Sequence, residues 1–326
     1  MRSVSIVTWL LGAACLVWLF ASNDFSTLLT AAASLRAWLV LIILFHGVVL
    51  LADVLGWRLL FARRPRLGEL FRIRWIGEAA NGLLPVPHLG ELLRVKLARD
   101  RGSDSIDAGA SVIADVTLGL ATQIIFVVVG LILLGLRGGR SGLARAAAAA
   151  LVLAAFGFLF YALQRTRLLS RFVDAIGRRT GSSWHLFDAG GARRLEDALH
   201  LIYDDRRRVS AALFWRLAAW FLGAGEIWLV PYCLGHPIGF GAAVTLESLS
   251  QAARAAAFIV PGGLGVQDGT LMVLSAQMGL GPGLGLLVSL VKRLREVALG
   301  LPALGLAAAT SAFSSVNAAE RPARSG

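Results

Sequence analysis

Long apolar stretches restrict the fold of this chain more than any other feature. About 20 consecutive apolar residues in a helix cross a hydrocarbon core roughly 30 Å thick. The clearest apolar windows are Val4–Ser22, Ala37–Ala52, Val116–Leu136, Ala146–Leu163 and Val297–Ala319. Hydrophobic residues make up 57% of the chain and charged residues only 16%, which leaves too few polar side chains to coat a soluble globule. The sequence therefore predicts an all-α, polytopic integral membrane helix bundle.

Three further apolar windows contain charges or a proline. They are Ala211–Val230 with Arg216 and Glu226, Gly239–Val260 with Glu247 and Arg254, and Gly269–Val291 with an interruption around Pro282. Together with the clearer windows they predict six to eight crossings.

Two Pro/Gly breaks interrupt the apolar pattern, one in each half of the chain. The residues of these breaks are Pro85 and Pro87 in the first, and Pro261, Gly262, Gly263 and Gly265 in the second. Proline lacks the N–H group that an interior helical position donates, so the helix must end near each break. A pair of interrupted segments in corresponding halves is a pointer to a substrate site near the membrane midplane. We predict two broken, re-entrant segments there.

The distribution of basic residues predicts the topology. Arginines and lysines cluster after the second window, at 94–101, and along the polar stretch 164–208, so these loops are expected to face the cytoplasm. Segment 68–96 must then enter the membrane and return to the same side, and the N-terminus is cytoplasmic. The net charge of +12 is thereby explained by topology, and we expect no nucleic-acid partner.

The sequence predicts a single transmembrane domain over residues 1–319, with a cytoplasmic loop at 164–208 and a disordered tail at 320–326. Within the loop, Leu195, Leu199 and Ile202 fall at helical spacing. This pattern fits a helix lying on the membrane surface, and a solvated connector fits the composition equally well.

Polar residues flank the first break. A helix that restarts near His88 places Glu91 and Arg94 one turn apart, and Asn81 precedes the prolines. The free N–H groups at the start of that helix could receive an anionic headgroup. The alternative is a cytosolic turn with a surface ion pair, which contributes little to stability. We favour binding, because irregular backbone at membrane depth persists only against protein or a wet cavity.

A second group of polar residues surrounds the second break. Glu247, Gln251 and Arg254 fall at i, i+4 and i+7, so one helix presents them on one stripe, and Asp268 follows the break. A charge at the bilayer centre costs roughly 2.5–3.5 kcal/mol on insertion scales, so these side chains should face the protein interior. Either they bind a ligand or they form an ion pair that locks the bundle.

Other charged residues extend the candidate site. Asp115 lies on the same side of its predicted helix as Gln123, and Arg295 belongs to a charged group at 292–296 between two apolar stretches. That group could neutralise a phosphate, although the end of a crossing is the favoured interpretation. His46 and Asp53 share a face at i, i+7, a pattern too weak to indicate a proton relay.

No enzymatic signature stands out in the sequence. Gly-x-Ser-x-Gly, His-Glu-x-x-His and a phosphate loop ending in Lys-Ser/Thr do not occur, and the histidines are scattered. The two cysteines have neither the spacing nor the setting of a metal or redox pair. We expect no enzyme, no catalytic residue, no metal and no cofactor.

Several motifs resemble a known family across nearly the whole chain. Asn81-Gly-Leu-Leu-Pro85, Gly90-Glu91-x-x-Arg94 and Val260-Pro-Gly-Gly-Leu-Gly265-Val-Gln-Asp268 are similar to the flippase-like membrane region of lysylphosphatidylglycerol synthases and their stand-alone relatives. More narrowly, Ala110-Ser-Val-Ile-Ala-Asp115, Gly223-Ala-Gly-Glu226-Ile-Trp228, Leu246-Glu247-Ser-Leu-Ser-Gln251-Ala-Ala-Arg254 and Lys292-Arg-Leu-Arg295-Glu296 resemble the HpnL-type proteins associated with hopanoid biosynthesis. The resemblance implies a lipid transporter or flippase of a bacterial inner membrane, linked to hopanoids.

The hypothesis that follows is a polar headgroup cavity between the two broken segments. Glu91, Arg94, Glu247, Arg254 and Asp268 are expected to line it. The substrate would be a membrane lipid, hopanoid or another amphipathic lipid. The alternative is a membrane scaffold or accessory subunit that holds lipid-synthesis enzymes through the 164–208 loop.

Overall fold

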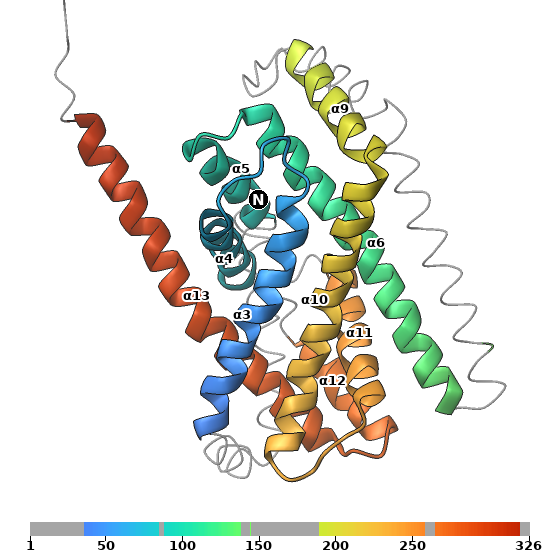
Figure 1. Ribbon diagram of the computed structural model, residues 1–326. Coiled ribbons are helices and arrows are strands. Elements are labelled where there is room, and N and C mark those ends of the chain that lie inside the picture. Colours follow the sequence, from blue (N-terminus) through green and yellow to red (C-terminus); the bar gives the residue numbers. More distant parts are fainter. Residues whose placement is uncertain (1–35, 85–87, 138–143, 145–188, 258–264, 320–326) are drawn as a thin grey trace, which may run out of the picture.

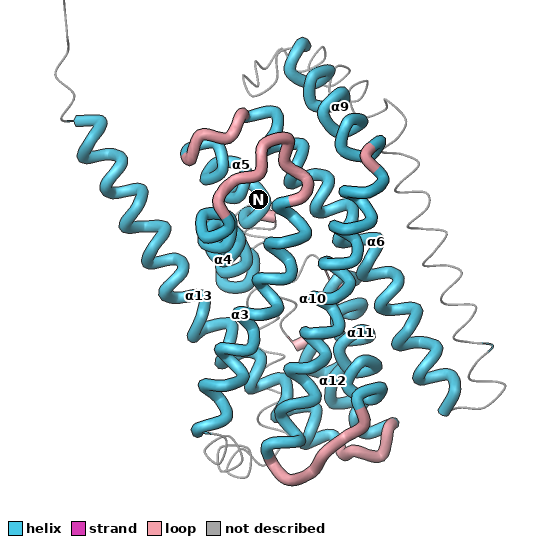
Figure 2. The backbone as a smooth tube through the Cα atoms, viewed as in Figure 1, coloured by secondary structure: helices cyan, strands magenta, loops and turns pink. Residues whose placement is uncertain are grey.

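The protein is described by a computed structural model over residues 36–84, 88–137, 144, 189–257 and 265–319. Every regular element in these ranges is a helix, and the predicted all-α membrane bundle is confirmed (Figure 2). Several predictions fall outside the described residues: the windows Val4–Ser22 and Ala146–Leu163, the residues Pro85, Pro87, Pro261, Gly262 and Gly263, loop residues 164–188, and the tail 320–326.

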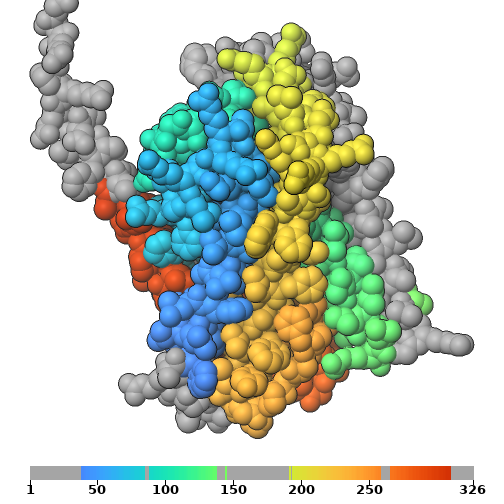
Figure 3. Space-filling view, viewed as in Figure 1, coloured from blue at the N-terminus to red at the C-terminus, as the bar shows by residue number. Residues whose placement is uncertain are grey.

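Three long helices form the frame of the bundle. They are α3 (Arg36–Arg58), α6 (Ser105–Arg137) and α10 (Arg206–Cys233), and within the described residues they are the helices long and apolar enough to cross a membrane. α3 runs in one direction and α6 and α10 run in the other (Figure 1). α3 and α10 lie side by side on the face seen in Figure 3. Large apolar side chains such as Leu44 and Phe214 are exposed on this frame, as expected for helices that face lipid.

Two helical hairpins enter this frame from opposite ends. The first consists of α4 (Leu67–Leu83) and α5 (Leu89–Asp100), and it begins and ends at the Arg58 end of α3. The second consists of α11 (Phe240–Ala256) and α12 (Val266–Gln277), and it begins and ends at the Cys233 end of α10. Both turn back at the predicted breaks, which agrees with the expected re-entrant segments.

Glycines allow the two helices of the first hairpin to approach closely. A Cβ atom at Gly90 would overlap the backbone oxygen of Gly77, and one at Gly77 would crowd the side chain of Arg94. His88, just before α5, has a left-handed backbone with φ of 58°. The pair of glycines therefore sets the spacing of α4 and α5.

The last helix corrects one predicted boundary. α13 (Pro282–Ala319) is continuous through residues 292–296, which the sequence analysis interpreted as the end of a crossing. The chain instead breaks earlier, where Gly279 and Gly281 adopt positive φ and Pro282 begins the helix. The charged group stays helical because its side chains find buried partners, described below.

The polar loop ends in an amphipathic helix, α9 (Ala189–Asp204). Leu195 is buried, and Leu199 and Ile202 pack against an apolar cluster that contains Trp57 and Val112. The apolar face of α9 is thus occupied by protein, chiefly α6, instead of the membrane surface. Only the opposite face of the helix is available to solvent or a partner.

Two apolar clusters occupy opposite ends of the bundle. One is built around Trp57, Phe61 and Leu70, and the other around Ile227 and Leu246. On α3 and α10 four charged or titratable side chains lie between these clusters and face the interior: His46, Asp53, Arg216 and Glu226. The charged layer of the protein lies there.

Candidate functional site

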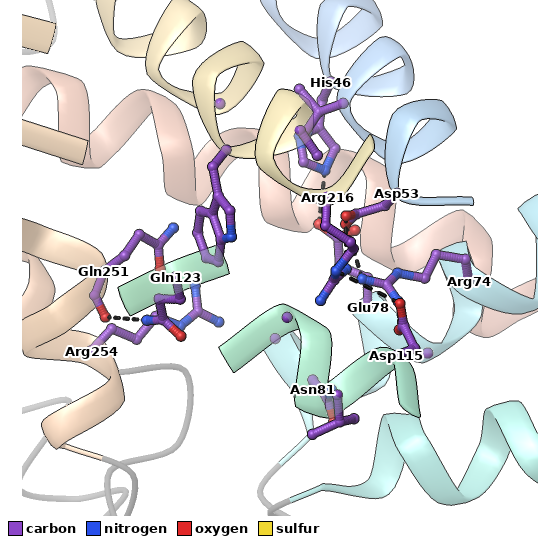
Figure 4. Close-up of a pocket in the computed structure, with 18 of the residues that line it drawn as sticks. His46, Asp53, Arg74, Glu78, Asn81, Asp115, Gln123, Arg216, Gln251 and Arg254 are labelled. Carbon is purple, nitrogen blue, oxygen red and sulfur yellow. Dashed lines mark hydrogen bonds and ion pairs between the residues drawn. The ribbon is translucent and has the colours of Figure 1, made fainter. Parts of the chain in front are cut away.

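A cavity of about 490 Å³ lies between the two apolar clusters. It is lined by α3, α4, α5, α6, α10, α11 and α13, so both hairpins contribute to it. Its volume is in the range of small-ligand sites. Eight of the nine predicted binding residues line it: Asn81, Glu91, Arg94, Asp115, Glu247, Gln251, Arg254 and Arg295. Figure 4 shows Gln251, Gln123 and Arg254 on one wall and the larger group around Arg216 and Asp115 on the other.

The arginine cluster, formed by Asp53, Arg74, Arg94, Asp115 and Arg216, occupies the wall nearer the Arg58 end. Asp115 is fully buried, and one of its oxygens, Oδ2, accepts from Arg74 Nη1 and from Arg94 Nη2, each at 2.6 Å. Asp53 accepts from Arg74 Nη2 at 2.9 Å and from Arg216 Nη1 at 2.7 Å. Three guanidinium groups thus face two carboxylates, which leaves one positive charge in excess.

Two of these arginines retain unused donors. The buried Nε–H groups of Arg94 and Arg216 have no hydrogen-bond partner among the described residues, and Arg216 Nε lies 3.6 Å from Asp115. The Arg94 guanidinium also lies 4.1 Å from the centre of the Trp57 ring, a cation–π contact that stabilises the positive charge of the arginine. Since a buried unpaired donor costs about 1–3 kcal/mol, an anion with several oxygens fits this cluster.

The histidine cluster, formed by His46, Glu78, Glu226 and Arg295, lies further along the same helices. His46 Nε2 is 2.7 Å from Glu78 Oε1, and His46 Nδ1 is 2.7 Å from Glu226 Oε1. Arg295 Nη1 contacts Glu226 Oε2 and lies 2.9 Å from His46 Nδ1. Arg295 therefore faces the cavity from within α13, which corrects its interpretation as the end of a crossing.

The opposite wall is formed by the α11 stripe of Glu247, Gln251 and Arg254. Glu247 accepts from Lys292 Nζ at 2.5 Å and from Gln251 Nε2 at 2.8 Å. Arg254 Nη1 lies 3.3 Å from Glu296 Oε1. The contacts with Lys292 and Glu296 are ion pairs between α11 and α13, and Glu247, Gln251 and Arg254 also line the cavity. The sequence left open whether this stripe binds a ligand or forms an ion pair that locks the bundle. The structure is compatible with both.

The residues that flank the first break are divided between two roles. Asn81 Oδ1 accepts from the backbone N–H of Gly90 at 2.8 Å, and Asn81 Nδ2 donates to Glu91 Oε1 at 3.0 Å. These contacts join α4 to α5. Arg94 pairs with Asp115 of α6, so Glu91 remains the partly exposed carboxylate of this wall.

Asp268 does not line the cavity, which corrects the predicted site. Its Oδ2 accepts from the backbone N–H of Gly265 at 2.8 Å, so it caps α12 at the second break. It is also bonded to Ser289 and to Arg293 of α13. An acidic residue at the third position of a helix is a known capping signal, and this role explains its place after the glycines.

Several lining residues were missed or left without a role by the sequence analysis. They are His46, Asp53, Arg74, Glu78, Arg216, Glu226 and Glu296. A usable signal existed on α4, where Arg74, Glu78 and Asn81 fall at i, i+4 and i+7, the same spacing as the α11 stripe. Within the described residues, no group of three or more His, Cys, Asp or Glu side chains is arranged to hold a metal ion.

Comparison with known proteins supports a membrane role. A family model of the lysylphosphatidylglycerol synthase TM region matches residues 4–303. No curated protein and no solved structure matches the chain. Together with the three helices long enough to span a bilayer, the family match identifies a membrane protein.

Proposed function

Since this chain belongs to the lysylphosphatidylglycerol synthase TM-region family, we propose that it moves a lipid across the membrane and that the cavity receives the polar headgroup. The observation that carries the proposal is the arginine cluster, which faces a cavity located where two hairpins from opposite ends converge. Charged side chains inside a membrane protein are costly and typically mark a substrate path. The apolar body of the lipid would stay in the bilayer while the headgroup passes between the hairpins.

The excess positive charge of the arginine cluster favours an anionic headgroup. Guanidinium groups bind phosphate oxygens in pairs; Arg94 Nε has no hydrogen-bond partner among the described residues, and Arg216 Nε has only its 3.6 Å ion pair with Asp115. A phosphate group, or another compact anion on a lipid, is therefore the headgroup that the cluster fits best. The resemblance to HpnL-type proteins makes a polar-headed hopanoid the second lipid to test.

A crevice between α4 and α13 offers a route for the apolar part of the lipid. It has a volume of about 30 Å³ and shares five lining residues with the cavity: His46, Glu78, Gly82, Arg295 and Glu296. Its remaining wall is mostly apolar: Trp75, Ala79, Leu83, Leu299 and Gly300. In the proposed mechanism the lipid enters sideways here, with its headgroup toward the arginine cluster.

The proposed orientation places the Arg58 end of α3 in the cytoplasm of a bacterium, with the protein in the inner membrane. Exposed basic residues gather at that end, among them Arg63, Arg64 and Arg66, as the positive-inside rule requires. Cysteines introduced one at a time at Arg64 and at His236, at the opposite end, test this orientation in a protein whose native Cys15 and Cys233 are replaced by serine. A membrane-impermeant thiol reagent applied from the periplasm should label only the second.

The function is tested with purified protein in phosphatidylcholine vesicles that contain tail-labelled phosphatidylglycerol. Arg254→Ala, partly exposed in the cavity, should lower the rate of lipid movement about tenfold, the effect of losing one charged contact, and Glu91→Ala should lower it because Asn81 loses the carboxylate that joins α5 to α4. Arg64→Ala, an exposed arginine outside the cavity, should move lipid at the wild-type rate. Normal rates in both cavity variants, once shown to be folded, would contradict the proposal.

A measurement in cells links the activity to a lipid. The lipids of inner and outer membranes are compared with and without the gene. A shift in the distribution of hopanoid or anionic lipid at constant total amount supports transport. Disappearance of one species, or accumulation of its precursor, supports a role in biosynthesis.

A scaffold is the second candidate because α9 presents exposed side chains on the face opposite its packing on α6. Leu201 on that face is 74% exposed, and Asp197 is exposed as well. Residues 164–188 can be exchanged for a neutral linker while α9 keeps its packing on α6. Together with a charge reversal at Asp197, this exchange should abolish the function of a scaffold and leave lipid movement nearly intact.

A further inference from the structure

His46 makes contacts that one protonation state cannot satisfy. A neutral imidazole has one N–H and one bare nitrogen, and an ionised carboxylate only accepts. Both ring nitrogens of His46 lie 2.7 Å from carboxylate oxygens, of Glu78 and of Glu226. With both carboxylates ionised, these contacts require a proton on each nitrogen, that is, an imidazolium.

The contact with Arg295 requires that Nδ1 of His46 carry no proton. Arg295 Nη1 lies 2.9 Å from His46 Nδ1, and a guanidinium only donates. This contact is a hydrogen bond only when Nδ1 is bare, in which case Arg295 also holds Glu226. The cluster therefore has two alternative sets of hydrogen bonds that differ by one proton on Nδ1, and in the neutral set the bare Nδ1 must move away from Glu226 Oε1.

We propose that the histidine cluster is a proton-binding site that couples proton uptake to the binding of an anionic lipid headgroup in the adjoining cavity. The proton comes from water and binds the Nδ1 lone pair, and no bond between heavy atoms changes. The net charge of the cluster rises from −1, with two carboxylates and Arg295, to zero. Coupling to the headgroup rests on the proposed function, and the proton site itself does not.

The burial of the cluster gives the proton a defined entry. The Glu78 side chain is 42% exposed, whereas those of His46, Glu226 and Arg295 are 11% exposed or less. Glu78 lines both the cavity and the crevice beside it. Because His46 also lines the cavity, water there can deliver the proton to Nδ1, while Nε2 keeps its proton and its bond to Glu78.

The other charges around the cluster are already paired. Lys292 of α13 holds Glu247 of α11, and Glu296 of α13 is bound by Arg293 and Arg254. On α4, Arg74 is bound by the two aspartates of the arginine cluster. His46 is therefore the member of this layer, among the described residues, whose hydrogen-bonding contacts call for both the protonated and the unprotonated form.

Protonation of His46 changes what the cavity presents to a ligand. When Nδ1 carries a proton it repels Arg295, which lines the cavity, and the cavity wall gains one positive charge. An anionic headgroup then binds more tightly, and by linkage its binding raises the affinity of His46 for the proton. A proton gradient would therefore drive the lipid in the direction of proton entry.

The proton site is tested by NMR of protein with 15N-labelled histidine in phosphatidylcholine nanodiscs. The His46 signals are identified by their loss in His46→Gln. From about pH 5 to about pH 10 we expect both ring nitrogens to be protonated at the acidic end and Nδ1 to lose its proton on alkalinisation. An Nδ1 that keeps one state over the whole range would overturn the proton site.

Coupling is tested in vesicles that contain tail-labelled phosphatidylglycerol, with and without a pH gradient. The gradient should accelerate movement by the wild-type protein about tenfold, a coupling of about 1.4 kcal/mol. It should have no effect on His46→Gln, whose amide keeps one donor and one acceptor, whereas the exposed-loop control His236→Gln should behave as wild type.

The outcomes separate this inference from the proposed function. Lipid movement that is indifferent to the gradient in the wild type would overturn the coupling and leave the function standing. An absence of lipid movement in every protein would overturn the function and the coupling, and titration of His46 would still establish the proton site.

Discussion

The arginine cluster and the histidine cluster share three helices but hold their charges differently. α3, α4 and α10 each contribute one residue to each cluster, in the pairs Asp53 and His46, Arg74 and Glu78, and Arg216 and Glu226. The arginine cluster contains groups that stay charged at any physiological pH. The histidine cluster contains an imidazole between two carboxylates, whose charge is variable. A fixed charge suits the binding of an anion, and a variable charge suits control of when it binds.

The largest difference between the clusters is expected on removal of a central charge. Asp115→Asn leaves three buried guanidinium groups with one aspartate, which should lower the free energy of unfolding by about 3–5 kcal/mol. His46→Gln should cost much less, because Glu226 keeps Arg295 as its partner. Thermal unfolding in detergent, followed by tryptophan fluorescence, measures both, with exposed Asp197→Asn as the control. Equal costs for the two variants would remove the distinction between the clusters.

A change in the first hairpin should disturb one cluster more than the other. A methyl group at Gly90 meets the backbone of Gly77, which cannot move aside cheaply, so Gly90→Ala should destabilise the protein by about 1–3 kcal/mol. Displacement of α5 removes Arg94 from Asp115, whereas no member of the histidine cluster lies on α5. The melting temperature should fall while His46 still titrates in the NMR experiment. Gly68→Ala, which has open space, is the matched control.

A substitution on α6 should separate function from stability. A methyl group at Gly119 would overlap Nη2 of Arg216, the flexible end of a side chain, so Gly119→Ala should displace that guanidinium from Asp53. The unfolding free energy should fall by about 1–2 kcal/mol, less than in Asp115→Asn, because alanine favours the helix and Arg216 keeps Asp115 nearby. Phosphatidylglycerol movement should fall about tenfold with the loss of one charged contact. Gly109→Ala, which meets only Leu195 at 3.4 Å, should leave both quantities unchanged.

The smallest effect on stability is expected at the exposed edge of the histidine cluster. Glu78→Gln should change the unfolding free energy by less than about 1 kcal/mol, because the side chain is 42% exposed. It should nevertheless lower the pH at which Nδ1 of His46 loses its proton, since one of two anionic partners is gone. An unchanged titration would show that Glu226 alone controls the imidazole.

Much of the fold could be predicted because membrane-spanning helices are recognisable in a sequence by their length and apolarity. The hairpins could also be predicted, since prolines and glycines interrupt apolar segments in only two places with polar neighbours. The continuity of α13 could not, because a charged group such as 292–296 looks like a helix end until its buried partners are known. Those partners, Glu226 and Glu247, lie far away in sequence.

The candidate site shows the same division. Glu247, Gln251 and Arg254 were found by periodicity, and Arg74 with Glu78 had the same periodicity on α4. Arg74, however, ends a basic run that fits a cytoplasmic loop. It was therefore assigned to that loop and not to the site. Asp268 was predicted to bind the ligand and instead caps α12, because a capping carboxylate and a binding carboxylate give the same sequence pattern beside a glycine break. Only the distance to Gly265 distinguishes them.

The sharing of α3, α4 and α10 between the clusters has a mechanical consequence. At about 1.5 Å of rise per residue, the two members are separated by about 6 Å on α4, about 10 Å on α3 and about 15 Å on α10. The distance between the two clusters, measured along the helix axis, therefore differs from helix to helix. Any tilt that keeps the contacts of one cluster aligned shifts those of the other by different amounts on each helix. Binding of a ligand at one cluster can therefore change the contact distances in the other cluster, although the two clusters have no atom in common.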